Sequence, residues 1–177
     1  MNEALNLSLD KEGLDIKQKY ENNVGSLEPQ ATFKFIKNGN IFASKCEYIV
    51  NPVNVVGVMG KGLALEFKNN FPKHFEFYKK YCDNGMFDIG GLIRYHEKGR
   101  GIFCLPTKKH WRDPSKIGYV GMGLDALAKS VVDFHVKSVA LPKLGCGEGG
   151  LDWEKEVKPL ILSKLSHLKD LEVEIYE

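Results

Sequence analysis

Hydrophobic and polar residues change their spacing several times along this 177-residue chain. Alternation and short apolar runs, both typical of strands, predict strands at 32–36, 46–50, 91–95, 102–105, 137–141 and 171–176. Apolar residues three and four positions apart predict helices at 60–71, 72–81, 113–134 and 153–168. Strands that alternate with helices favour an α/β sandwich around a mostly parallel sheet.

The first 32 residues do not share this pattern. They hold six acidic and three basic side chains and end in the soft connector NNVGSLEPQ. We expect residues 1–32 to be an N-terminal extension, either a frayed helix or disordered. Residues 33–177 are then the single folded domain.

Composition narrows the class of protein. Hydrophobic residues make up 43% and charged residues 27%, which excludes wholesale disorder, and the net charge of +2 requires no polyanionic partner. The four cysteines form no CxxC pair, which excludes a zinc ribbon and a thioredoxin site, and we expect no metal. No apolar run is long enough to span a membrane, so the sequence favours a cytoplasmic protein with reduced thiols.

A first candidate binding segment follows the predicted strand at 46–50. It reads NPVNVVGVMGKG, with Asn51 and Asn54 ahead of Gly57, Gly60 and Gly62. Asparagine amides suit vicinal ribose hydroxyls, and glycines at a helix start let backbone N–H groups approach an anion. An Asx turn with a glycine-lined cap would give the same pattern. The segment fits neither a Walker A loop nor a Rossmann fingerprint.

A second candidate segment, LGCGEGGLDW at 144–153, has four glycines in six positions. Glycine is costly in chain entropy, so this density indicates unusual backbone angles or a close ligand, such as a pyrophosphate. A mobile lid without any contact is the alternative. Cys146 lies here, but no histidine is near it in sequence, so a small-residue role is favoured over a nucleophile.

Between these segments, PTKKHWRD at 106–113 follows the predicted strand at 102–105. A lysine at a strand end beside other cations is a candidate nucleophile or proton carrier. The basic residues also suit a single nucleic-acid strand, with Trp111 stacking on a base. A solvated basic turn is the alternative.

Together these segments resemble a macrodomain, the ADP-ribose-binding α/β/α fold, over about residues 33–177. Four motifs carry the resemblance in the family's order: GNIF, YIVNPVN, GVMGKGLALEF and LGCGEGGLDW. PTKKHWR and GCGEGGLDW are most similar to the DarG-type macrodomains, antitoxins that remove ADP-ribose from thymidine bases in DNA. The resemblance implies a three-layer fold with a mixed, mostly parallel central sheet.

The resemblance also implies residue roles. Lys108 would be the catalytic lysine, and Asn54 would orient the distal ribose. Contacts to ADP-ribose would come from Asn40, Ile41, Asn51, Gly60, Lys61, Gly62, Leu63, Thr107, Gly145, Cys146, Gly147, Glu148, Gly149 and Tyr176. Contacts to nucleic acid would come from Lys109, His110, Trp111 and Arg112.

Two positions depart from the family pattern. Asn40 stands where an aspartate often accepts a hydrogen bond from adenine N6, which an asparagine oxygen can also accept. Gly149 stands where protein-directed glycohydrolases carry an aspartate. That difference favours the DNA-directed branch.

The implied activity is a glycohydrolase that releases ADP-ribose from thymidine in single-stranded DNA and needs no cofactor. A non-catalytic reader of ADP-ribose, or a hydrolase of protein-linked or small-molecule derivatives, are the alternatives. The implied partners are ADP-ribosylated DNA and an ADP-ribosyltransferase toxin, with no membrane and with the chain as a monomer.

Overall fold

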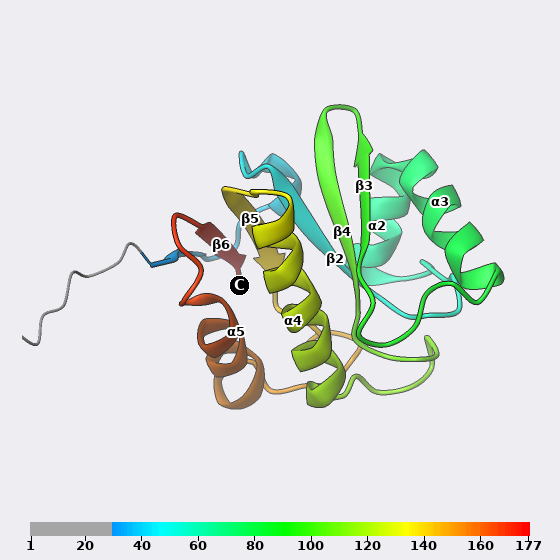
Figure 1. Ribbon diagram of the computed structural model, residues 1–177. Coiled ribbons are helices and arrows are strands. Elements are labelled where there is room, and N and C mark those ends of the chain that lie inside the picture. The colour runs from blue at the N-terminus through cyan, green and yellow to red at the C-terminus, as the bar shows by residue number, and fades with distance from the viewer. Residues whose placement is uncertain (1–29) are drawn as a thin grey trace, which may run out of the picture.

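The computed structural model describes residues 30–177. Nearly all of the predicted extension, residues 1–29, lies outside the described residues. Figure 1 shows a central sheet with helices on both of its faces.

Within the described residues the sheet has six strands, in the order β1-β6-β5-β2-β4-β3. Neighbouring strands run parallel except β3 and β4, which pair antiparallel at one edge. The mixed, mostly parallel sheet is therefore confirmed. The strands are β1 (Thr32–Ile36), β2 (Tyr48–Val53), β3 (Ile93–Glu97), β4 (Arg100–Pro106), β5 (Ser138–Pro142) and β6 (Glu172–Tyr176).

Helices cover both faces of this sheet, which confirms the three-layer fold. The α2 and α3 helices pack on one face, and the α4 and α5 helices pack together on the other (Figure 1). No helix within residues 30–177 is long and apolar enough to cross a membrane. The helices are η1 (Ile41–Ala43), α2 (Gly62–Asn70), α3 (Pro72–Asp83), α4 (Ile117–Asp133), η2 (Trp153–Val157) and α5 (Lys158–Leu165).

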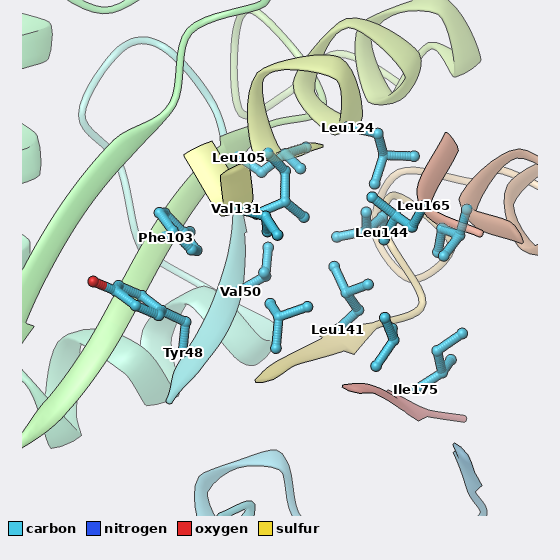
Figure 2. Packing of buried hydrophobic residues seen from close by; sticks show 14 of the residues in the cluster. Tyr48, Val50, Phe103, Leu105, Leu124, Val131, Leu141, Leu144, Leu165 and Ile175 are labelled. Atoms are coloured by element: carbon cyan, nitrogen blue, oxygen red, sulfur yellow. The ribbon is translucent and has the colours of Figure 1, made fainter. Parts of the chain in front are cut away.

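The larger core lies between the sheet and the α4 and α5 helices (Figure 2). The α4 helix buries Leu124, Leu127 and Val131, a spacing of three and four residues that forms one stripe. Gly123 lets this helix approach the sheet, because a Cβ there would lie 2.6 Å from the Leu105 side chain. Burying a Leu or Val side chain contributes about 1.5–3 kcal/mol, so this layer holds the strands firmly in register.

Several elements differ from their predicted bounds, among them β3, which was predicted at 91–95 and runs from Ile93 to Glu97. The β2 strand continues to Val53, so Asn51 lies inside it and not after it. The α4 helix begins at Ile117 and not near Asp113. The backbone N–H groups of Ser115 and Lys116 instead donate to the carbonyls of Gly149 and Thr107. The helix predicted at 153–168 opens with the single π-helical turn η2 and ends as a helix at Leu165.

The order of the strands fixes where the candidate residues meet. The β4, β2 and β5 strands are adjacent and parallel, so the loops that follow them leave the same edge of the sheet. Those loops are the two glycine-rich segments and the basic segment. In open α/β sheets this carboxyl edge is where ligands bind.

Candidate functional site

Asn54 organises the loop that follows β2. Its side-chain oxygen accepts hydrogen bonds from the backbone N–H of Val56 (3.1 Å) and Val58 (3.2 Å), and its amide donates to the carbonyl of Val58 (2.7 Å). The single hydrogen of the buried Tyr78 hydroxyl is shared between the Asn54 backbone carbonyl (2.9 Å) and the same side-chain oxygen (3.1 Å). The Asn54 side chain therefore stabilises this loop, and one hydrogen of its amide makes no hydrogen bond with the described residues.

The loop ends at the N-terminus of α2, which no side chain caps. The N-cap residue is Lys61, and the first turn contains no acidic residue. Gly62 has a φ of 56°, a left-handed conformation that disfavours other residues. Uncapped N–H groups beside a lysine form a favourable position for an anion.

The basic segment is joined to this loop by its backbone. Thr107 N–H donates to the carbonyl of Val53 (3.0 Å), and Val55 N–H donates to the carbonyl of Lys109 (3.0 Å). These two hydrogen bonds flank Asn54 in the loop after β2 and Lys108 in the loop after β4. The two predicted catalytic residues are therefore neighbours.

Lys108 is buried although it is charged. Only 9% of the residue is exposed, whereas Lys109 points to solvent. The Lys108 ammonium donates to the backbone carbonyl of Glu148 at 3.1 Å. Charged lysines are rarely buried without a functional or structural partner, so this environment distinguishes Lys108 from its neighbour.

The second glycine loop packs on Ser115. Ser115 N–H donates to the carbonyl of Gly149 (2.9 Å), and its hydroxyl donates to the Thr107 hydroxyl (3.1 Å). A Cβ on Gly149 would lie 2.7 Å from the Cβ of Ser115, and one on Gly145 would lie 2.9 Å from it. The loop therefore has no space for a side chain at 149, which gives a physical reason for the missing aspartate.

Glu148 is the point where all three loops meet. Its carbonyl accepts from Lys108, and its carboxylate forms an ion pair with Lys61 at 2.9 Å. Lys61 comes from the loop after β2, Lys108 from the loop after β4, and Glu148 from the loop after β5. The arrangement places two cationic groups and several glycine N–H groups around one small region.

A second group of predicted residues lies near the end of β6. The Tyr176 ring would lie 3.0 Å from a Cβ on Gly39, next to Asn40 and Ile41. The Tyr176 hydroxyl donates to Glu174 (2.8 Å), and Asn40 accepts from the Phe42 N–H (2.9 Å). The structure thus brings together Asn40, Ile41 and Tyr176, three of the predicted ADP-ribose contacts.

The pKa of Glu174 is lowered by hydrogen bonds and by the charge of Lys34, which together outweigh the effect of burial. Burial alone would raise the pKa of this carboxyl, but the Ser44 and Tyr176 hydroxyls and Lys34 leave it below its usual value. An ionised Glu174 holds the Tyr176 hydroxyl and so fixes the ring. Sequence reasoning missed Glu174, and only its alternation with the buried Val173 and Ile175 marks its strand position.

The predicted nucleic-acid residues form an exposed turn beside Lys108. Trp111 is 45% exposed, its ring lies 5.3 Å from the His110 ring, and the Arg112 guanidinium lies 4.4 Å from its centre. Lys116, which sequence reasoning missed, is also exposed on this segment. The turn offers an aromatic surface surrounded by positive charge.

One predicted contact is enclosed by the sheet. Asn51 is fully buried inside β2, with its amide 3.7 Å from the Met59 sulfur and its oxygen without a partner in the described residues. Burial raises the pKa of Cys146 to about 11, so its thiol is protonated at neutral pH and is a poor nucleophile.

The remaining predicted contacts lie on the same loops. Gly60 is exposed, Leu63 packs against the core that contains Ile41, and a Cβ on Gly147 would meet nothing within 4 Å. Within residues 30–177, no three His, Cys, Asp or Glu side chains are grouped so that they could hold a metal ion.

Comparison with known proteins points to one family. The Macro domain family model matches residues 50–159. A curated relative from Thermus aquaticus, named DNA ADP-ribosyl glycohydrolase, is 45% identical over 81% of this chain and 41% of its own length. Another from Thermosipho africanus, a DNA ADP-ribosyl transferase–DNA ADP-ribosyl glycohydrolase fusion protein, is 30% identical over 92% of this chain and 50% of its own. The chain thus spans about half the length of these relatives or less.

Solved structures agree with this result. The macrodomain of Thermus aquaticus DarG matches with a TM-score of 0.78 and 44% identity, covering 83% of this chain and 99% of that one. Thermosipho africanus DarTG in complex with ADP-ribose matches with a TM-score of 0.72 and 32% identity, covering 84% of this chain and 43% of that one. The sequence, the fold and these matches together show that the chain belongs to the macrodomain family and is similar to the DarG macrodomains.

Proposed function

We propose that this protein is an ADP-ribosyl glycohydrolase that removes ADP-ribose from thymidine bases of single-stranded DNA. The observation that carries the proposal is Lys108, a buried lysine held between the two glycine loops. The names of the relatives support the DNA substrate. The exposed basic turn at Trp111 supports it too, because single strands bind to aromatic surfaces surrounded by positive charge.

The site residues suit this reaction. ADP-ribose would lie with its adenine near Asn40 and Tyr176, its diphosphate at the α2 N-terminus, and its distal ribose between Asn54 and Lys108. Overall, water adds to the anomeric carbon, the bond to the base breaks, and the base regains a proton. Lys108 would either assist opening of the ribose ring or attack the anomeric carbon. Fixing the ribose beside Lys108 lowers the entropic part of the barrier.

The lack of space at Gly149 supports the DNA-directed reaction over the protein-directed one. A carboxylate at this position would collide with Ser115, so Lys108 has no acidic partner there. We further propose that the chain works as a monomer in the cytoplasm, without a cofactor, opposite an ADP-ribosyltransferase. The fused transferase in the Thermosipho africanus relative supports such a partner, and four free thiols suit a reducing compartment.

The test compares substrates directly. The protein is incubated with ADP-ribosylated single-stranded DNA and, separately, with ADP-ribosylated protein, and loss of label is followed. We expect release from DNA alone. Calorimetry with free ADP-ribose should give micromolar affinity, about −8 kcal/mol. Release only from protein would overturn the DNA assignment, and binding without release from any conjugate would make the protein a reader.

A further inference from the structure

The ion pair between Lys61 and Glu148 joins the two glycine loops. The Lys61 nitrogen lies 2.9 Å from the Glu148 carboxylate, although both side chains are mostly exposed, at 76% and 63%. The other six ion pairs between described residues do not connect these loops. This pair is therefore placed where it can restrict access to the site.

Glycines flank both partners of the pair. Lys61 lies between Gly60 and Gly62, and Glu148 lies between Gly147 and Gly149. A Cβ on Gly147 or Gly62 would meet nothing within 4 Å, whereas Gly149 packs closely on Ser115. The ion pair therefore joins the open side of each loop.

Glu148 also covers Lys108. The same residue that pairs with Lys61 through its carboxylate accepts the Lys108 ammonium through its carbonyl. A displacement of the Glu148 backbone would break this hydrogen bond. Lys61 and Lys108 are thus linked through a single residue.

We propose that the Lys61–Glu148 ion pair is a strap that ADP-ribose opens by exchange. This inference rests on the proposed function. The diphosphate carries negative charge, so it repels the Glu148 carboxylate and competes with it for Lys61 and the uncapped α2 N-terminus. Lys61 passes from Glu148 to the diphosphate, Glu148 withdraws, and the Lys108 ammonium is released toward the ribose.

A double-mutant cycle with free ADP-ribose tests the exchange. Glu148→Gln frees Lys61, so we expect ADP-ribose affinity at low salt to rise about two- to fivefold, the range for an exposed ion pair. In the Lys61→Ala background the same substitution should have a clearly smaller effect, because no pair remains to be broken. The difference should vanish at high salt, which screens exposed charges.

The matched control is another exposed ion pair between a lysine and a carboxylate. Lys129 and Asp133 pair near the end of α4, at the opposite edge of the sheet from the glycine loops. Lys129→Ala and Asp133→Asn change the net charge equally and should leave ADP-ribose affinity unchanged. An equal response in this pair would show that only net charge matters and would overturn the strap.

A second measurement needs no ligand. Reductive methylation of Lys108, followed by mass spectrometry, should be about two- to fivefold faster in Lys61→Ala than in the wild type, because the strap no longer holds Glu148 over it. Equal labelling, or an equal effect of Glu148→Gln in both backgrounds, would overturn the strap alone. No binding of ADP-ribose by the wild type would overturn the proposed function and the exchange with it.

Discussion

Lys108 and Lys109 are adjacent in sequence, but only Lys108 is buried against the glycine loop. If Lys108 supplies the reacting amine, Lys108→Ala should abolish release of ADP-ribose from DNA. Free ADP-ribose should still bind, because the N–H groups of both loops remain. Label release and calorimetry measure the two effects separately.

Lys109→Ala is the matched control, since it removes the same charge one residue away. We expect it to keep most of the activity, because its backbone carbonyl still accepts from Val55 and its side chain faces solvent. Full activity in Lys108→Ala would rule out a lysine mechanism.

The buried residue His74 should make the free energy of unfolding depend on pH. It is fully buried, and its Nε2 lies 2.9 Å from the Cys104 sulfur. Burial lowers the pKa of His74 to about 4, although Glu97 acts in the opposite direction. The unfolded chain therefore binds more protons between pH 6.5 and 4. We expect the free energy of unfolding to fall by up to about 3 kcal/mol over that range because of His74.

Urea unfolding at pH 7, 5.5 and 4.5 measures this loss. In His74→Phe the loss between pH 6.5 and 4 should be smaller than in the wild type, whatever the stability of the variant at pH 7. His135→Asn is the control, because His135 is exposed and its positive φ of 53° suits asparagine. The same pH dependence in wild type and His74→Phe would contradict the assignment.

The glycine loop at 145–150 depends on close backbone contact with Ser115. Gly149→Ala places a Cβ 2.7 Å from the Ser115 Cβ, so the loop must shift. We expect a loss of about 1–3 kcal/mol in unfolding free energy and weaker ADP-ribose binding. Gly147→Ala adds the same methyl group where nothing lies within 4 Å, and it should fold normally. Equal unfolding free energies for the two variants would refute the packing account.

The turn that precedes α4 presents Trp111 to solvent. Trp111→Ala should weaken single-stranded DNA binding by about 1–3 kcal/mol, the range for stacking of one base, and leave free ADP-ribose affinity unchanged. Phe134→Ala removes a similarly exposed aromatic from the end of α4 and serves as the control. Equal losses in both variants, measured by fluorescence anisotropy, would place the DNA elsewhere.

The spacing of apolar residues predicted most helices and strands, because this spacing and the turn residues are properties of short segments. It also predicted the alternation of strands and helices and the two glycine-rich loops. The family resemblance then indicated Lys108, and not Lys109, as the catalytic lysine. The sequence pattern placed the start of α4 too early, because Pro114 and Ser115 resemble a helix start while Ser115 bonds to Gly149 and Thr107. The meeting of Lys61, Lys108 and Glu148 could not be predicted, since it depends on which strands are neighbours.

At the scale of the whole molecule, charge is nearly balanced. The chain carries a net charge of only +2, so the proposed binding of DNA depends on the charges of the local turn. The exposed Lys109, Arg112 and Lys116 offer about three phosphate contacts. We expect log K for unmodified single-stranded DNA to fall against log salt with a slope of about −2. A slope near zero in a salt titration would contradict phosphate contact.

The pairing of β1 with β6 has a consequence for how the domain opens. The register joins Thr32 to Glu172, so forming this edge closes a loop of roughly 140 residues. Among residues 30–177, β1 has a single neighbour in the sheet, and none of its five residues is fully buried. Local opening therefore begins most easily at β1, and its amide hydrogens should exchange with solvent before those of β2. The α4/α5 core can stay closed while this happens, so we expect opening at β1, beside the β6 residues Glu174 and Tyr176, and not at Lys108.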